Sequence, residues 1–263
     1  MSRISLMTPT IRNSAVARVN PVAKLIAALI VGVVLLLTID PVSALVALGL
    51  ELILFLWAGV SFGEFFRRTA PLWIAAPLAG LTTVLYGVDS GATMWQFGFV
   101  SVTDGSLTLG WVIILRLLAA GLPAIVLFVT TDPTDLADGL GQVLRLPERF
   151  VIGGLAGMRL VGLFIEDWHS LSLARRARGV GDSGRIRRFL GQAFALLVLA
   201  LRRGSKLATA MEAKGFGLST RRTWARPSAF GWPEFALVAI GVFVAAAAVT
   251  VSVATGNWRW ILG

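Results

Sequence analysis

Long apolar runs separated by short polar turns dominate the chain. Five of these runs come close to the ~20 largely apolar residues that a helix needs to cross ~30 Å of hydrocarbon at 1.5 Å per residue. The pattern therefore predicts an all-α integral membrane protein with about five transmembrane helices. The predicted spans are Val22 to Ile39, Val42 to Ser61, Ala70 to Val88, Leu107 to Thr130 and Ala236 to Thr255.

Two further apolar stretches, Phe150 to Ile165 and Leu190 to Leu201, are shorter than the other runs. If each crossed the membrane, the three arginines between them would lie outside, whereas basic residues tend to stay on the cytoplasmic side. We therefore expect long amphipathic helices here. Their apolar faces would lie against the membrane helices or in the membrane interface.

Composition agrees with a bilayer protein. Hydrophobic residues make up 56% of the 263 residues and charged residues 14%, whereas soluble domains carry about 25% charged residues. The chain has no cysteine and one histidine, His169. Disulfides, thiolate catalysis and metal sites built from Cys or clustered His are therefore excluded, and we expect no metal site.

Charge placement predicts the orientation in the cytoplasmic membrane. The N-terminal segment is basic, and Arg67 and Arg68 lie between the second and third predicted spans. The Asp40-Pro41 turn and the connection from Asp89 to Asp104 hold no Lys or Arg. Under the positive-inside rule, the N-terminus and the Arg67 connection are cytoplasmic and the other two connections lie outside.

The basic excess is concentrated in one segment. Between Arg145 and Arg226 lie 16 of the 24 basic and 5 of the 14 acidic residues, a local net charge of +11. Such a segment suits anionic lipid, nucleic acid or an acidic protein surface. The predicted organisation is therefore N-terminal membrane helices over 1–130, a basic cytoplasmic region over 131–229 and a C-terminal transmembrane helix over 230–263.

One local pattern occurs twice in the basic region. Ala177-Arg178-Gly179 and Ala213-Lys214-Gly215 each close a helix-favouring stretch, and they lie 36 residues apart. Glycine just past a helix is the favoured left-handed terminator, and a cation in the last turn faces the negative end of the helix dipole. Any basic helix could end this way, so the local pattern alone leaves a purely structural interpretation open.

The arrangement resembles the T component of energy-coupling factor (ECF) transporters, the EcfT/CbiQ family, which is marked by two Ala-Arg-Gly motifs ending two cytoplasmic coupling helices. Three further stretches are similar to family elements in the same order. They are Asn20-Pro21-Val22-Ala23-Lys24-Leu25, Thr130-Thr131-Asp132-Pro133 and Met158-Arg159. The resemblance covers roughly Asn20 to Phe216.

The resemblance implies a non-catalytic scaffold that transmits ATP-driven movement of two ABC ATPase subunits, separate or fused, to a small substrate-binding S component. Vitamins and transition-metal ions are the implied solutes. Arg178 and Lys214 would dock into the ATPases, with Arg175 and Arg176 adding long-range attraction. ATP and Mg²⁺ would bind the partners, since this chain has no phosphate-binding Gly-x-x-x-x-Gly-Lys-Ser/Thr loop. No nucleic acid partner is implied.

The second motif departs from the family pattern, which typically has Arg where this chain has Lys214. A guanidinium can hold a carboxylate through two parallel hydrogen bonds, whereas an ammonium is a point charge. Lys214 should keep the attraction and lose some geometric definition.

Two ionisable residues fall within predicted spans, Glu51 in the second and Arg116 in the fourth. Charged groups inside a membrane are functional candidates by default. They could pair with each other or contact the S component.

Two other functions are alternatives. A stand-alone channel or secondary transporter would need ionisable residues converging near the membrane midplane, and usually an inverted repeat. A membrane phospholipid transferase is suggested by Asp135 and Asp138, but the further aspartates that such a motif needs do not follow.

Overall fold

The computed structural model describes residues 18–57, 62–87, 91–97, 100–179, 184–217, 224 and 226–258. Within these ranges almost all regular structure is helical, which confirms the all-α prediction. The basic N-terminal segment through residue 17 and the predicted span ends at Ser61 and Val88 lie outside the described residues.

The chain divides into two compact units. Of the described residues, those from 18 to 132 and from 229 to 258 form one, here called the membrane unit, and those from 133 to 228 form the other, here called the basic unit. The basic unit is thus an insertion between two helices of the membrane unit.

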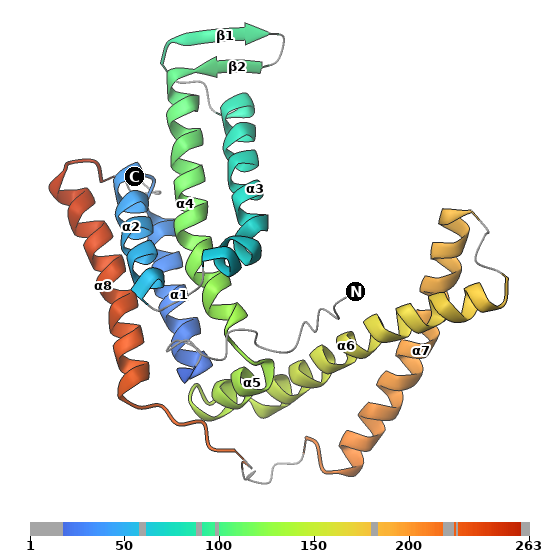
Figure 1. The fold of residues 1–263 in the computed structure, drawn as a ribbon. Helices are drawn as coiled ribbons and strands as arrows, with labels where there is room; N and C mark the ends of the chain where they lie inside the picture. Colours follow the sequence, from blue (N-terminus) through green and yellow to red (C-terminus); the bar gives the residue numbers. More distant parts are fainter. Residues whose placement is uncertain are drawn as a thin grey trace. The chain divides into compact units, whose positions relative to one another are not determined.

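In the described part of the membrane unit there are five helices. α4 and α8 each pack against both α1 and α2, and α3 packs against α4 (Figure 1). One apolar cluster joins Leu35 of α1, Ala119 of α4 and Val244 of α8, and another joins α3 to α4 around Ala76 and Leu122. The helix bounds are α1 Pro21–Leu37, α2 Pro41–Trp57, α3 Phe62–Tyr86, α4 Asp104–Val129 and α8 Trp232–Ala254.

Three of these helices are long and apolar enough to cross a membrane, over Phe65–Tyr86, Asp104–Leu127 and Trp232–Ala254. α1 and α2 have 17 residues each. At 1.5 Å per residue that gives about 25 Å, somewhat less than the ~30 Å of a typical hydrocarbon core.

Two details differ from the sequence prediction. Arg67 and Arg68 lie within α3 rather than in a connection, because the helix begins at Phe62, ahead of the predicted apolar run. The connection after α3 also contains an antiparallel hairpin of β1 (Thr93–Phe97) and β2 (Val100–Thr103), which lies beyond the ends of α3 and α4 in Figure 1.

Polar caps begin the membrane helices. The Asn20 side-chain oxygen accepts from the backbone N–H of Val22 at 3.0 Å, and Asp40 Oδ2 accepts from that of Ser43 at 2.7 Å. At α4, Thr103 and Ser106 exchange side chain to backbone hydrogen bonds at 3.0 and 3.1 Å. These contacts satisfy N–H groups that a helix start leaves unpaired.

The start of α1 also holds the two points where the chain leaves and re-enters the membrane unit. Lys24, which is 2% exposed, donates its ammonium to the backbone oxygen of Thr130 at 3.1 Å, at the end of α4. Asn20 donates its side-chain amide to the backbone oxygen of Ala229 at 2.8 Å and its backbone N–H to Glu234 at 3.1 Å. One short segment therefore fixes both ends of the insertion.

The residues described in the basic unit form three helices, α5 (Pro133–Gln142), α6 (Glu148–Ala177) and α7 (Arg185–Ala213). The two predicted apolar stretches fall inside α6 and α7, which confirms the expectation of long helices, here of 30 and 29 residues. α5 holds the returning chain, since Gln142 donates to the Arg226 carbonyl and accepts from the Ser228 N–H, both at 2.8 Å.

Lys24→Met should destabilise the membrane unit by about 1–3 kcal/mol, because the carbonyl of Thr130 loses a charged donor in a buried site. Thermal unfolding of the detergent-solubilised protein measures this loss. Leu25→Met, at the next position and 37% exposed, is the matched control and should change stability by less than about 0.5 kcal/mol. Equal melting temperatures for the two variants would contradict the role of Lys24.

Candidate functional site

The first Ala-basic-Gly motif forms the end of α6. Ala177 is the last helical residue, and Arg178 is the C-cap, with φ −89° and ψ 4°. Its N–H donates to the carbonyl of Ala174 at 3.2 Å. Gly179 follows with φ +72°, the left-handed conformation expected of a glycine terminator. Arg178 is exposed.

The second motif ends α7 in the same way. Ala213 is the last helical residue, and Lys214 is the C-cap, with φ −87° and ψ 9°. Gly215 has φ +82°. Its N–H donates to the carbonyl of Glu212 at 2.9 Å, and the N–H of Phe216 donates to that of Met211 at 2.9 Å. These two hydrogen bonds make a complete Schellman motif.

The two ends therefore share one backbone geometry. Their C-cap dihedral angles agree within a few degrees, both glycines are left-handed, and Arg178 and Lys214 are both exposed. The predicted helix-terminating role of Gly179 and Gly215 is confirmed. What differs between the ends is the cationic head group.

Arg175 and Arg176 differ in their surroundings. Arg176 is exposed, whereas Arg175 is partly buried and donates from Nη1 to the backbone oxygen of Arg188 at 3.3 Å. Its guanidinium lies over Gly191 of α7, where an added Cβ would come within 3.1 Å of both terminal nitrogens. Arg175 thus reaches from the last turn of α6 to the first turns of α7.

The structure does not bring the two intramembrane candidates together. Arg116 is half-buried in α4 and donates to the backbone oxygen of Leu36, one of the last carbonyls of α1. Glu51 is 4% exposed, and neither of its carboxyl oxygens has a hydrogen-bond partner among the described residues. The suggested pairing of these two residues is therefore absent from this structure.

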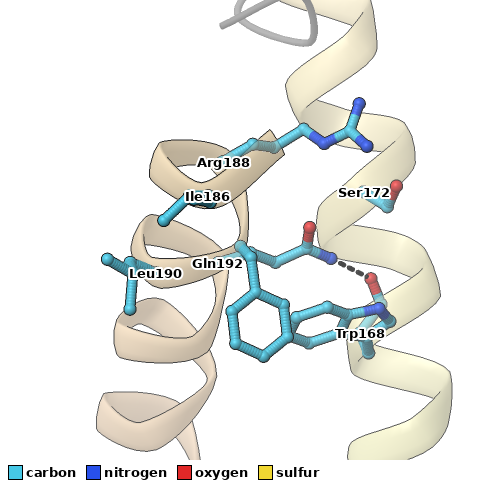
Figure 2. Close-up of a pocket in the computed structure, with 7 residues that line it drawn as sticks. Trp168, Ser172, Ile186, Arg188, Leu190 and Gln192 are labelled. Carbon is cyan, nitrogen blue, oxygen red and sulfur yellow. Dashed lines mark hydrogen bonds between the residues drawn. The ribbon is translucent and has the colours of Figure 1, made fainter. Parts of the chain in front are cut away.

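Sequence reasoning missed a group of polar contacts where α6 crosses α7. Arg203 holds Asp167 through both carboxylate oxygens, with Nη2 to Oδ1 at 3.0 Å. Gln192 donates to the backbone oxygen of Trp168 at 2.7 Å, as Figure 2 shows, beside a hollow of about 450 Å³. The spacing of 36 residues between Asp167 and Arg203 equals that between the motifs, but no local pattern in the sequence marks the two residues as partners.

Comparison with known proteins decides the family. The family model CbiQ, cobalt transport protein, matches residues 12–224, which is most of the chain. The chain belongs to the CbiQ family. Since curated relatives across the same length are ECF transporter transmembrane proteins, this family member is the T component of an ECF transporter.

Two of these relatives show how much of this chain the similarity covers. The energy-coupling factor transporter transmembrane protein EcfT of Acidaminococcus fermentans is 27% identical over 247 residues, covering 88% of this chain and 91% of the relative. That of Streptococcus thermophilus is 28% identical over 236 residues, covering 85% and 89%. The family match itself includes helices α1 to α7 and both helix ends.

Glu51→Leu should raise the thermal stability of this T component, because a buried carboxyl without a partner costs about 1–3 kcal/mol of desolvation that leucine avoids. The melting temperature of the purified protein measures the change. Ile53→Leu, on the exposed side of the same helix, is the control and should leave it unchanged. A lower melting temperature for Glu51→Leu would mean that the carboxyl has a stabilising partner.

Proposed function

We propose that this T component couples ATP hydrolysis to micronutrient uptake. Two ABC ATPase subunits, separate or fused, would dock at the ends of α6 and α7, and a substrate-binding S component would receive their movement through the membrane protein. ATP and Mg²⁺ would be held by the ATPases, and the solute, a vitamin or a transition-metal ion, by the S component. This chain would catalyse no reaction itself.

The equivalence of the two helix ends carries the proposal. Each of two similar ATPases would offer one groove. Two grooves of the same shape would bind two helix ends of the same shape. The ends of α6 and α7 have matching C-cap geometry and each exposes a cation, Arg178 or Lys214. A structural terminator needs the glycine but does not require an exposed cation in both copies.

An exposed apolar stripe supports the second partner. Its apolar residues recur every three or four positions along α7, and each is more than half exposed. They are Ile186, Leu190, Phe194, Leu197 and Leu201. Apolar surface of this extent needs cover by lipid or by another protein. We propose that the S component and the bilayer supply that cover in the assembled transporter.

The net charge supports a cytoplasmic position for the basic unit and the N-terminus. Moving a segment of net charge +11 across the membrane would oppose the positive-inside rule, and ATPases that use cellular ATP are cytoplasmic. We therefore place the basic unit, with both helix ends, on the cytoplasmic side.

A stand-alone transporter receives less support. Such a protein would bring ionisable groups together near the membrane midplane, but Arg116 is engaged by the backbone of Leu36 and Glu51 is buried away from it.

Arg178→Glu should weaken ATPase co-purification by about 30-fold or more, because reversing a charge at a desolvated contact costs about 2 kcal/mol or more. Lys214→Glu should weaken it less, since an ammonium defines the contact less sharply than a guanidinium. Arg187→Glu, an exposed charge reversal on the same unit, is the control. Undiminished co-purification with Arg178→Glu would overturn the docking role.

Reconstitution tests the requirement for partners. Liposomes holding this chain alone should take up no vitamin or metal ion, whereas liposomes that also contain the S component and both ATPases should show ATP-dependent uptake. The control replaces ATP by a non-hydrolysable analogue. Uptake by the chain alone would favour the stand-alone transporter.

A further inference from the structure

Polar contacts at several positions along the two helices hold α6 and α7 together where they cross. Asp167 of α6 pairs with Arg203 of α7, and further along α6 Arg175 donates to the carbonyl of Arg188. Residues later in α6 therefore contact residues earlier in α7. The two helices cross in an antiparallel sense.

Buried side chains form part of the contact between the two helices at this crossing. Gln192 is 4% exposed and donates to the backbone oxygen of Trp168 at 2.7 Å. The rings of Trp168 and Phe189 pack with their centroids 5.6 Å apart. The Asp167 side chain is 16% exposed and that of Arg203 38%, so the ion pair is shielded on the side of Asp167.

The ion pair occupies equivalent positions on the two helices. The interval along the chain from Asp167 to the cation Arg178 is the same as the interval from Arg203 to Lys214. Each interval is about three helical turns, or about 16 Å at 1.5 Å per residue. Each docking cation therefore lies on nearly the same helix face as the member of the ion pair that precedes it.

Equal intervals place the two helix ends at the same distance along each helix from the ion pair. Because the helices are antiparallel, the two ends lie on opposite sides of the crossing. The partners in the proposed function are two ATPase subunits, and a pair of subunits of one kind offers two equivalent sites. The ion pair would therefore bear on the separation of the two ends that meet those sites.

We propose that the Asp167–Arg203 ion pair is the pivot of the α6–α7 pair, and that it sets the separation and orientation of the two docking ends. Asp167 and Arg203 are positioning residues in this proposal, with Gln192 and Arg175 limiting rotation about the pivot. The proposal rests on the proposed function for its consequence in transport, but its structural part does not.

The chemistry of the pair suits a pivot better than a stabilising contact. A partly exposed ion pair adds only modestly to stability, but a bidentate Arg–carboxylate pair fixes the planes of both groups. The paired charges favour one register of the two helices, in line with the hydrogen bonds of Gln192 and Arg175. Losing the pair should therefore broaden the distribution of distances between the helix ends. The melting temperature should fall only slightly.

The cysteine-free chain permits a direct test by pulsed electron paramagnetic resonance. Spin labels are attached at Ala174→Cys and Ala210→Cys, exposed positions one turn before each motif. The otherwise unchanged full chain should give one narrow distance distribution. Asp167→Asn and Arg203→Gln should each broaden it at least two-fold, and the exchange of Asp167→Arg with Arg203→Asp should restore it. Glu166→Gln and Arg202→Gln are the neighbouring exposed controls and should leave it narrow.

The complete transporter supplies the second measurement. Asp167→Asn should reduce the solute taken up per ATP hydrolysed at least three-fold while the ATPases still co-purify, whereas Arg178→Glu should release them. A distance distribution that stays narrow in Asp167→Asn and Arg203→Gln, or that the charge exchange fails to restore, would overturn the pivot. ATPases retained by Arg178→Glu would overturn the proposed function and leave the distance measurement valid.

Discussion

The segment that begins α1 is the constraint on which the arrangement of the chain depends. The basic unit is inserted between α4 and α8, so its two connections must leave and re-enter the membrane unit. Lys24 holds the end of α4 through Thr130, and Asn20 holds Ala229 just before α8. Both contacts use backbone carbonyls and buried donors. The start of α1 therefore fixes the points at which both connections meet the membrane unit.

Two carboxyl groups buried in the membrane unit differ in their hydrogen bonding. The carboxyl of Asp40 accepts hydrogen bonds from Ser43 and, across 212 residues, from Ser252 at 2.6 Å, and that contact joins the α1–α2 turn to α8. Glu51 is buried as deeply and has no such partner among the described residues. Unpaired polar groups in apolar surroundings cost free energy, so the burial of Glu51 should lower the stability of this arrangement of helices.

Local chemistry explains what the sequence could predict. Apolar length located α1, α2, α3, α4 and α8 within a few residues, except where α3 extends beyond its apolar run. Glycine chemistry predicted the left-handed Gly179 and Gly215 because the requirement for positive φ is satisfied within one turn of the chain. In each case the determining interactions lie within one helix or between the helix and lipid.

Contacts between distant segments could not be predicted in the same way. Asp167 and Arg203 are ordinary charged residues on the polar faces of two helices, and their pairing depends on a crossing that no local pattern specifies. The same holds for Asn20 and Ala229, which are 209 residues apart. The hairpin from Thr93 to Thr103 was missed because short strands leave a weaker periodic signal than a complete membrane span does.

The second motif, which has Lys214 where the family typically has Arg, is followed by a contact with the start of α6. Beyond Lys214 the chain makes a further left-handed turn at Gly217, with φ +91°, and the carbonyl of Gly217 accepts a hydrogen bond at 3.0 Å from Arg149 in the first turn of α6. The end of α7 is therefore braced on both sides, by its Schellman hydrogen bonds and by α6. An ammonium defines direction less sharply than a guanidinium, so the position of the second cation depends more on its backbone. The contact between Arg149 and Gly217 adds a restraint on that backbone from outside the motif.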